Sequence, residues 1–193
     1  MSNPKAFARA FKTQVTILGG SIALMWALEI LDVIVFRQKI NLNIYGIIPR
    51  EIMGLRGILF APFLHNGFAH LISNTIPFLV LGWFVMLQKT SEFFIVTPII
   101  MLVSGLGVWL LGSPAVHIGA SGVIFGYLGF LLARGFFDRN FLSILLSLLV
   151  GSLYGGLIWG VLPNQPGVSW EGHLFGFIGG VLAARFLARQ KSK

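Results

Sequence analysis

One serine, Ser121, stands among small residues where a polar loop enters a long apolar run, in the stretch 117–126. A hydroxyl group inside a membrane has little water to bond, so it must face a cavity, a neighbouring helix or a carbonyl oxygen of the preceding turn. Beside a general base, such a hydroxyl can act as the nucleophile of acyl transfer. The alternative interpretation is that the small residues 119–122 only let two helices approach closely.

Each of the four histidines lies at or just before the start of an apolar run: His65, His70, His117 and His173. If these runs cross the membrane in one direction, all four histidines and Ser121 lie near the same membrane face. At a helical period His173 shares a face with Gly176, Gly180 and Ala184, and Ser121 adjoins Gly122, Gly126, Gly129 and Ala133. Two such faces can pack backbone to backbone, which would bring the His173 imidazole within hydrogen-bond reach of the Ser121 hydroxyl.

These residue types suit a serine nucleophile with a histidine base. The His173 imidazole would take the hydroxyl proton of Ser121 during attack and return it to the leaving amine. His70 and Asn74 are four residues apart on one helix face, so with the backbone N–H of Ser121 they could donate hydrogen bonds to a developing oxyanion. Phe125, one turn after Ser121, could pack against the imidazole and fix its orientation.

Taken singly, these polar residues also have structural explanations, as links between helices or as anchors at the membrane interface. No carboxylate is placed to complete a triad, because Glu171 points elsewhere on the helix of His173, and Glu29 and Asp32 belong to another span. We therefore expect a Ser–His dyad. The histidines have no nearby carboxylates or cysteines at ligand spacing, so we expect neither a metal nor a cofactor.

The composition is that of an integral membrane protein. Of the 193 residues, 56% are hydrophobic and 10% are charged, whereas about a quarter of a typical soluble domain is charged. The net charge of +8 is scattered between the apolar runs and at the two ends, which points to the lipid bilayer and not to nucleic acid as its partner. The absence of cysteine excludes a disulfide framework and a thiolate nucleophile.

The apolar runs predict an all-α polytopic bundle of six transmembrane helices. At about 20 residues for each span, we place them at 13–36, 70–87, 93–111, 119–134, 141–162 and 171–187. We expect three parts of the chain: a short cytoplasmic tail over 1–12, a single membrane domain over 13–188 and a basic cytoplasmic tail over 189–193. The connection 37–68 is too long for a simple connector and is partly apolar, so we expect it to lie in the membrane interface.

Six spans put both ends of the chain on one side of the membrane. Ten of the 14 lysines and arginines then lie on that side, and four lie on the other: Arg37, Lys39, Arg50 and Arg56. The positive-inside rule therefore predicts cytoplasmic termini. The candidate site would open toward the outer face of a bacterial plasma membrane.

Three motifs resemble those of the rhomboid family of intramembrane serine proteases. They are Gly119-Ala120-Ser121-Gly122, the H-x4-H-x3-N pattern of His65, His70 and Asn74, and Gly172-His173-Leu174-Phe175-Gly176. The resemblance extends over about 44–187 and implies Ser121 as nucleophile and His173 as general base. It implies an oxyanion hole made by His70, Asn74 and the Ser121 backbone N–H, with His65, Gly119 and Phe125 in supporting positions.

The resemblance also implies a substrate class, namely single-pass or other transmembrane proteins cut in or near a membrane-spanning helix after local unwinding. The substrate would enter beside the fifth span, with 163–170 as a lid. One family feature is absent, because Arg56 and Gly57 stand where the family has a tryptophan–arginine pair in the first loop. Two other hypotheses remain: a binding or chaperone-like protein of the same fold, and a small transporter or channel, which would need polar residues through the membrane depth.

Overall fold

The computed structural model describes residues 4–36, 41–163 and 167–191, and these residues are helical apart from loops and one isolated β-bridge. The α-helices within them are α1 (Pro4–Ile30), α2 (Gly57–Phe60), α3 (Phe68–Met86), α4 (Phe93–Leu111), α5 (Ser121–Asp138), α6 (Phe141–Tyr154) and α7 (Trp170–Lys191). The π-helix η1 (Leu31–Phe36) extends α1, and short 3-10 segments occur at η2 (Leu42–Tyr45), η3 (Ile52–Arg56), η4 (Ala61–Phe63), η5 (Thr90–Glu92) and η6 (Gly155–Val161).

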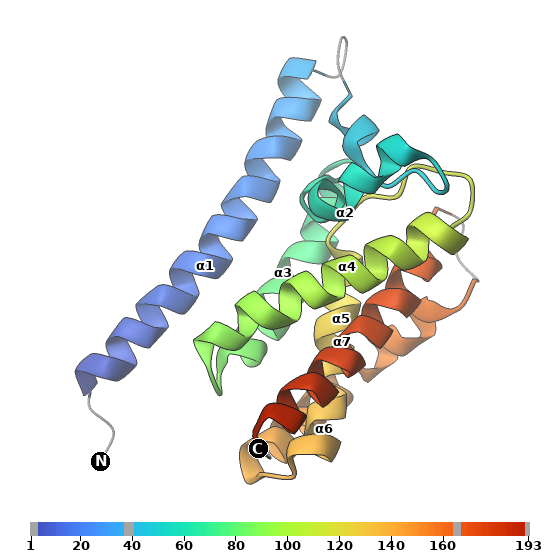
Figure 1. Cartoon of the computed structure of the whole chain (residues 1–193). Helices are drawn as coiled ribbons and strands as arrows, with labels where there is room; N and C mark the ends of the chain where they lie inside the picture. Colours follow the sequence, from blue (N-terminus) through green and yellow to red (C-terminus); the bar gives the residue numbers. More distant parts are fainter. Residues whose placement is uncertain (1–3, 37–40, 164–166, 192–193) are drawn as a thin grey trace.

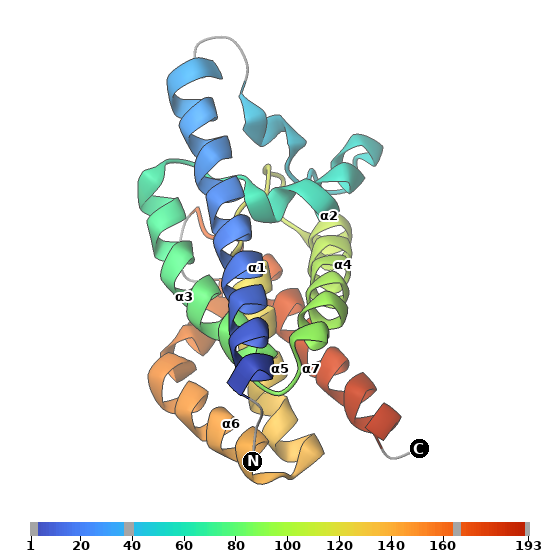
Figure 2. The same cartoon turned by 90° about the vertical axis from the view of Figure 1, so that its left-hand side faces the viewer.

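Helix α5 lies inside the bundle, where it contacts α3, α4, α6 and α7 (Figures 1 and 2). Its residues 123–131 are all buried, and Tyr127 and Phe130 among them are fully buried, whereas Phe136 in the last turn is exposed. A helix whose whole circumference is covered can place a side chain at its first residue in a defined protein environment. That first residue is Ser121.

Helix α7 runs along α4 and α5 (Figure 1). A β-carbon added at Gly176 would overlap the carbonyl oxygen of Gly122, and one added at Gly180 would overlap that of Gly126. Glycine at these positions lets the two backbones touch. The small-residue faces predicted for these two helices therefore do pack against each other.

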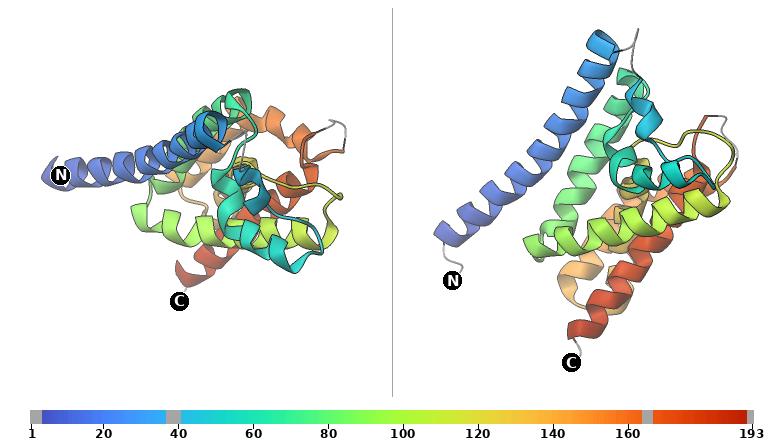
Figure 3. Two further views of the ribbon diagram at one scale, coloured as in Figure 1. Left: turned by 90° about the horizontal axis from the view of Figure 1, so that it is seen from above. Right: turned by 45° about the horizontal axis from the view of Figure 1, so that its top comes forward.

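Helix α1 leans away from the other helices (Figures 1 and 3) and contacts α3. Its link to the bundle includes Gln14, whose amide donates to the carbonyl of Met86 at 3.2 Å and accepts from the indole N–H of Trp83 at 3.1 Å. The helix begins at Pro4. The region expected as a polar tail over 1–12 is thus helical from residue 4 onward.

Four stretches within the described ranges are long and apolar enough to cross a membrane: Pro4–Val35, Phe68–Met86, Thr90–Leu111 and Phe141–Val161. Together with the apolar composition they make this an integral membrane protein. Helices α5 and α7 have 18 and 22 residues, but they are less apolar than α3, α4 and α6 and do not meet the same criterion. The expected count of six spans is therefore not established by length and composition.

The segment 41–63 folds over one end of the bundle, near the start of α5 (Figures 1 and 3). Ile47 and His117 form an antiparallel β-bridge, in which the backbone N–H of each donates to the carbonyl oxygen of the other with an N to O distance of 2.9 Å. The N–H of Gly119 donates to the carbonyl of Ala61 at 2.9 Å. These backbone bonds tie the long connection to the turn that precedes Ser121.

Arg50 and Trp109 hold the same segment to the end of α4. The Arg50 N–H donates to the carbonyl of Trp109 at 2.8 Å, and the Trp109 indole N–H donates to the carbonyl of Glu51 at 2.8 Å. The Arg50 guanidinium also donates to the carbonyl of Gly112 at 3.0 Å, a favourable place for a cation because carbonyls at a helix end lack intrahelical partners. These contacts anchor the loop that lacks the tryptophan–arginine pair. Of the four basic residues predicted outside, Arg37 and Lys39 fall outside the described residues.

Candidate active site

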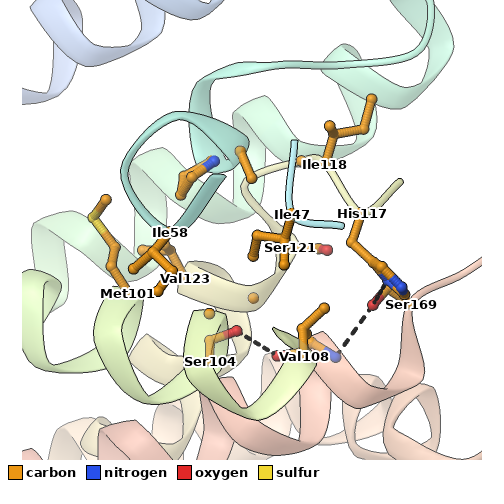
Figure 4. Close-up of a pocket in the computed structure, with 16 residues that line it drawn as sticks. Ile47, Ile58, Met101, Ser104, Val108, His117, Ile118, Ser121, Val123 and Ser169 are labelled. Carbon is orange, nitrogen blue, oxygen red and sulfur yellow. Dashed lines mark hydrogen bonds between the residues drawn. The ribbon is translucent and has the colours of Figure 1, made fainter. Parts of the chain in front are cut away.

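Ser121 follows a tight turn and lines a small cavity. Gly119 has φ +110°, a left-handed conformation that glycine adopts without steric cost, and Ala120 is the N-cap of α5. The cavity has a volume of about 40 Å³ and is also lined by His117 and Ser169 (Figure 4). Since one water needs roughly 10–15 Å³ by this kind of measure, the space beside Ser121 can admit water.

The imidazole of His173 is held from two sides. Its ring lies parallel to that of Phe125, with centroids 3.9 Å apart and an interplanar angle of 5°. Its Nδ1 lies 2.8 Å from the carbonyl oxygen of Gly160. A carbonyl can only accept a hydrogen bond, so Nδ1 carries the hydrogen and Nε2 keeps its lone pair. This tautomer is the one that a general base at Nε2 requires.

The starts of α5 and α7 meet next to the two predicted catalytic side chains. A β-carbon at Gly122 would lie 3.3 Å from the carbonyl oxygen of Gly172. Ser121 directly precedes Gly122 in the sequence, and His173 directly follows Gly172. The Gly172 carbonyl also accepts a hydrogen bond from the Ser104 hydroxyl at 2.9 Å (Figure 4). The packing of α5 on α7 therefore brings the predicted nucleophile and base to the same level of the bundle.

His70 faces the turn before Ser121. The backbone N–H of Asn66 donates to His70 Nδ1 at 3.4 Å, which leaves the ring hydrogen on Nε2. A β-carbon at Gly119 would lie 2.7 Å from that Nε2 atom. The N–H edge of His70 thus lies against the turn that leads into Ser121.

Asn74 is buried on the same face of α3 as His70. Its amide nitrogen donates to the carbonyl of His70 at 2.8 Å, which fixes the orientation of the side chain. Because an amide nitrogen has two hydrogens, this bond leaves one for another acceptor. The His70 ring and the Asn74 amide therefore each keep one N–H that can donate to a further acceptor.

His65 is enclosed and lies 5.1 Å from the His70 ring in an edge-on arrangement. Neither of its ring nitrogens has a hydrogen-bond partner within the described part of the chain. Burial, aided by the neighbouring His70, lowers the pKa of His65 from 6.5 to about 4. The residue is thus neutral at ordinary pH, as suits a supporting position.

His117 belongs to a hydrogen-bonded cluster that the sequence did not indicate, in which His117 and Glu171 are buried. Its Nδ1 lies 2.7 Å from the Ser169 hydroxyl and its Nε2 lies 3.0 Å from the carbonyl of Ser113. The Glu171 carboxylate accepts the N–H of Ser113 at 2.9 Å. The cluster joins the loop before α5 to the start of α7. His117 is buried in this cluster, although an interfacial anchor was one sequence interpretation.

Sequence reasoning also missed Gly160, whose carbonyl orients the His173 ring. A backbone carbonyl is common to every residue type, so no sequence signal could have identified it. Ser169, by contrast, carries a sequence signal: it is a serine directly before α7, where its hydroxyl accepts the N–H of Gly172 at 3.3 Å as an N-cap does, and Glu171 lies in the first turn. Among the described residues, no group of three or more His, Asp and Glu side chains is arranged to hold a metal ion.

The helical fold with its long apolar stretches defines an integral membrane protein, and comparison with known proteins identifies its family. The Rhomboid domain matches residues 53–190, so the chain belongs to the rhomboid family. It is similar to an uncharacterized protein of Mycobacterium tuberculosis, with 40% identity over 212 residues that cover 100% of this chain and 87% of the relative.

Two relatives with rhomboid names match a smaller part of the chain. The rhomboid protease GluP of Bacillus subtilis is 31% identical over 134 residues, which cover 67% of this chain and 25% of GluP. RHOMBOID-like protein 4 of Arabidopsis thaliana is 32% identical over 135 residues, which cover 65% of this chain and 32% of that protein. The resemblance seen in the three motifs is thereby confirmed.

Proposed function

We propose that this protein is an intramembrane serine endopeptidase, which hydrolyses a peptide bond in or near a transmembrane helix of a membrane-protein substrate. One observation carries the proposal. The His173 ring, held by Gly160 and Phe125 with Nε2 free, stands on a helix that packs backbone to backbone on the helix beginning with Ser121. A protein that only gripped helices would have no use for a base oriented in this way.

In the proposed reaction, Nε2 of His173 takes the hydroxyl proton of Ser121 as the hydroxyl oxygen attacks the carbonyl carbon of the substrate peptide. The carbonyl oxygen becomes an oxyanion, which accepts hydrogen bonds from the His70 ring, the Asn74 amide and the Ser121 backbone N–H. His173 then gives the proton to the leaving amine, and an acyl ester remains on Ser121. Water attacks this ester with His173 again taking a proton, which releases the carboxylate product and restores the serine hydroxyl.

The proposed topology has six spans, with α5 and α7 added to the four apolar stretches. Helix α5 is enclosed by other helices, so it needs less apolar surface than a helix that faces lipid. The beginning of α1 and the end of α7 lie at the same end of the bundle (Figures 1 and 2), as an even number of spans requires. The positive-inside rule supports the proposal that both termini are cytoplasmic and that the site opens toward the outer face.

The proposed substrate is a transmembrane helix that enters beside α6. The outward side chains of this part of the chain are apolar, and Leu148, Leu153 and Trp159 are 63–68% exposed. A helical substrate must unwind before its carbonyl can be attacked, because helical hydrogen bonds occupy that carbonyl. The predicted lid over 163–170 stays a prediction, since residues 164–166 lie outside the described ranges.

A cleavage assay in detergent tests the proposal. We expect the purified protein to cut a model single-span substrate without added metal or nucleotide, and Ser121→Ala to abolish the cut with the fold intact. Ser152→Ala, at an exposed serine of α6, is the matched control and should cut normally. Undiminished cleavage by Ser121→Ala would remove the nucleophile assignment.

Labelling with a fluorophosphonate separates a protease from a binding protein of the same fold. The wild-type protein should be labelled, and both Ser121→Ala and His173→Ala should lose the label. A wild-type protein that captures the single-span substrate but neither cuts it nor reacts with the probe would be a binder.

A further inference from the structure

Three acidic side chains, Glu171, Glu29 and Asp32, each direct one carboxylate oxygen to a backbone N–H, and Nδ1 of His173 bonds to a carbonyl instead of to any of them. Glu171 accepts the N–H of Ser113 at 2.9 Å, Glu29 accepts that of Gly67 at 2.7 Å, and Asp32 accepts that of Leu42 at 2.7 Å. In a Ser–His–Asp triad the acid fixes the tautomer and the orientation of the imidazole. Here a different group must do so.

The carbonyl oxygen of Gly160 occupies that position. It lies 2.8 Å from His173 Nδ1 and comes from η6, a different element from the helix that carries the histidine. A carbonyl is neutral, so it fixes the tautomer without the charge stabilisation that a carboxylate would add. Its contribution is therefore geometric.

The approach of η6 to the ring requires glycine at position 160. A β-carbon there would lie 2.7 Å from Cζ of Phe125 and 3.3 Å from Nδ1 of His173. The same ring of Phe125 stacks on the imidazole, so any side chain at 160 would push η6 away or disturb the stack. By contrast, Gly155 and Gly156 of the same segment have no neighbouring atom within 4 Å of an added β-carbon.

We propose that Gly160 is a positioning residue that takes the place of the third triad member, so that His173 acts as a base only while η6 is seated against it. This inference rests on the proposed function. If η6 moves away, Nδ1 loses its acceptor and the ring is free to carry its hydrogen on Nε2. In that tautomer Nε2 has no lone pair with which to accept the proton of Ser121. Movement of η6 away from α7 would thus prevent His173 from acting as the base.

The first experiment reads the tautomer and does not depend on activity. The protein is labelled with 15N-histidine in the Ser121→Ala background, and the His173 signals are assigned by their loss in His173→Gln. We expect hydrogen on Nδ1 and none on Nε2 at neutral pH. Hydrogen on Nε2 would overturn the proposal, whether or not the protein proves to be a protease.

The second experiment compares two alanine variants of η6. In the otherwise wild-type chain, Gly160→Ala should slow fluorophosphonate labelling at least about tenfold, because small misplacements of a catalytic group are costly. Gly156→Ala should label like wild type. In the 15N spectra, Gly160→Ala should move hydrogen from Nδ1 to Nε2, and Gly156→Ala should not.

Two outcomes of this comparison would overturn the proposal: wild-type labelling with an unchanged tautomer in Gly160→Ala, or an equal loss of labelling in Gly156→Ala. If Gly160→Ala does not fold, the His173 tautomer measured in the Ser121→Ala protein decides whether the proposal stands. Absence of labelling in the wild-type protein itself would count against the proposed function, and the tautomer would still test the bond from His173 to Gly160.

Discussion

Gly126 and Gly180 bring α5 and α7 into direct backbone contact, since a β-carbon added at Gly180 would overlap the carbonyl oxygen of Gly126. This contact lies along the same seam as the contact between Gly122 and Gly176. Because α5 and α7 touch through their backbones at these glycines, neither helix can slide far along the other. It therefore sets the relative height of the first turns, where Ser121 and His173 stand.

A methyl group in this seam should destabilise the protein. Gly180→Ala forces the two backbones apart, and overpacking of this kind costs about 1–3 kcal/mol. We expect a lower thermal midpoint in detergent and a loss of fluorophosphonate labelling. Gly20→Ala is the control, because an added β-carbon there has nothing within 4 Å, and alanine favours a helix by about 1 kcal/mol over glycine. Equal thermal midpoints for the two variants would show that the seam is not tightly packed.

Loss of the oxyanion donors should slow the reaction with little effect on the fold. Removal of one such donor typically costs about 10²–10³ in rate, so we expect losses of this size in cleavage rate for His70→Ala and for Asn74→Ala. Ser73→Ala, at an exposed residue of the same helix, should cut at the wild-type rate. Wild-type cleavage by both His70→Ala and Asn74→Ala would refute this oxyanion hole.

The stacking of the Phe125 ring on the His173 imidazole should contribute to the rate of the reaction by holding the base in position. Phe125→Leu keeps an apolar side chain but removes the parallel contact with His173. Aromatic pairs contribute about 0.5–1.5 kcal/mol beyond their buried area, so labelling should slow by up to about tenfold. Thermal unfolding should show that the variant remains folded. A labelling rate unchanged in this variant would mean that the stack does not position the base.

His65 should make stability depend on pH below neutrality. Burial and the neighbouring His70 lower the pKa of this histidine to about 4 in the folded protein, against about 6.5 in the unfolded chain. Between these values the unfolded chain binds a proton that the folded protein excludes. The free energy of unfolding should therefore fall as the pH is lowered from about 6.5 to about 4.

The measurement compares the wild-type protein with His65→Phe by denaturant unfolding in detergent over this pH range. The variant should show a smaller loss of stability on acidification. Parallel pH profiles for the two proteins would assign the acid sensitivity to other groups.

A buried ion network should stabilise the other end of the bundle. The Arg134 guanidinium pairs with both carboxylate oxygens of Glu92 and donates from Nε to Asp138 at 2.9 Å. Because loss of one partner leaves a buried charge uncompensated, Arg134→Met should cost about 3–5 kcal/mol. Arg185→Gln, at an exposed arginine, should change little.

The double variant Arg134→Met with Glu92→Gln tests this reason. It should be more stable than Arg134→Met alone, because one of the two carboxylates that lost their cation, that of Glu92, is then neutral. A double variant as unstable as the sum of the two single changes would show that the pair is not coupled.

Several features of the helices could be predicted from local sequence. The apolar run predicted at 93–111 coincides with α4, that at 70–87 is α3 within two residues, and the glycine faces of α5 and α7 do meet. Apolar runs, helical period and small-residue spacing are properties of the chain itself, so they can be read before folding. The first helix begins earlier than predicted, at Pro4, because nothing in the short polar segment before residue 13 stops a helix.

The fifth stretch shows the limit of such reading. The span predicted over 141–162 agrees with the single apolar stretch Phe141–Val161, but within it α6 ends at Tyr154 and the 3-10 segment η6 follows. The change at Gly155 lets the backbone of η6 turn toward His173, and only the neighbouring helices make that path favourable.

The sequence by itself determined the membrane class, the family and the residues that carry the proposed chemistry, because side-chain type and spacing are written in the chain. Only the tertiary structure decided how those residues are held: the Gly160 carbonyl on His173, the His117 bond to Ser169, and the Arg50 contacts with the end of α4. The physical reason is that two of these three interactions use backbone carbonyls, which every residue possesses, and all three join different elements, 13 to 62 residues apart in sequence. Their partners exist only once the chain is packed.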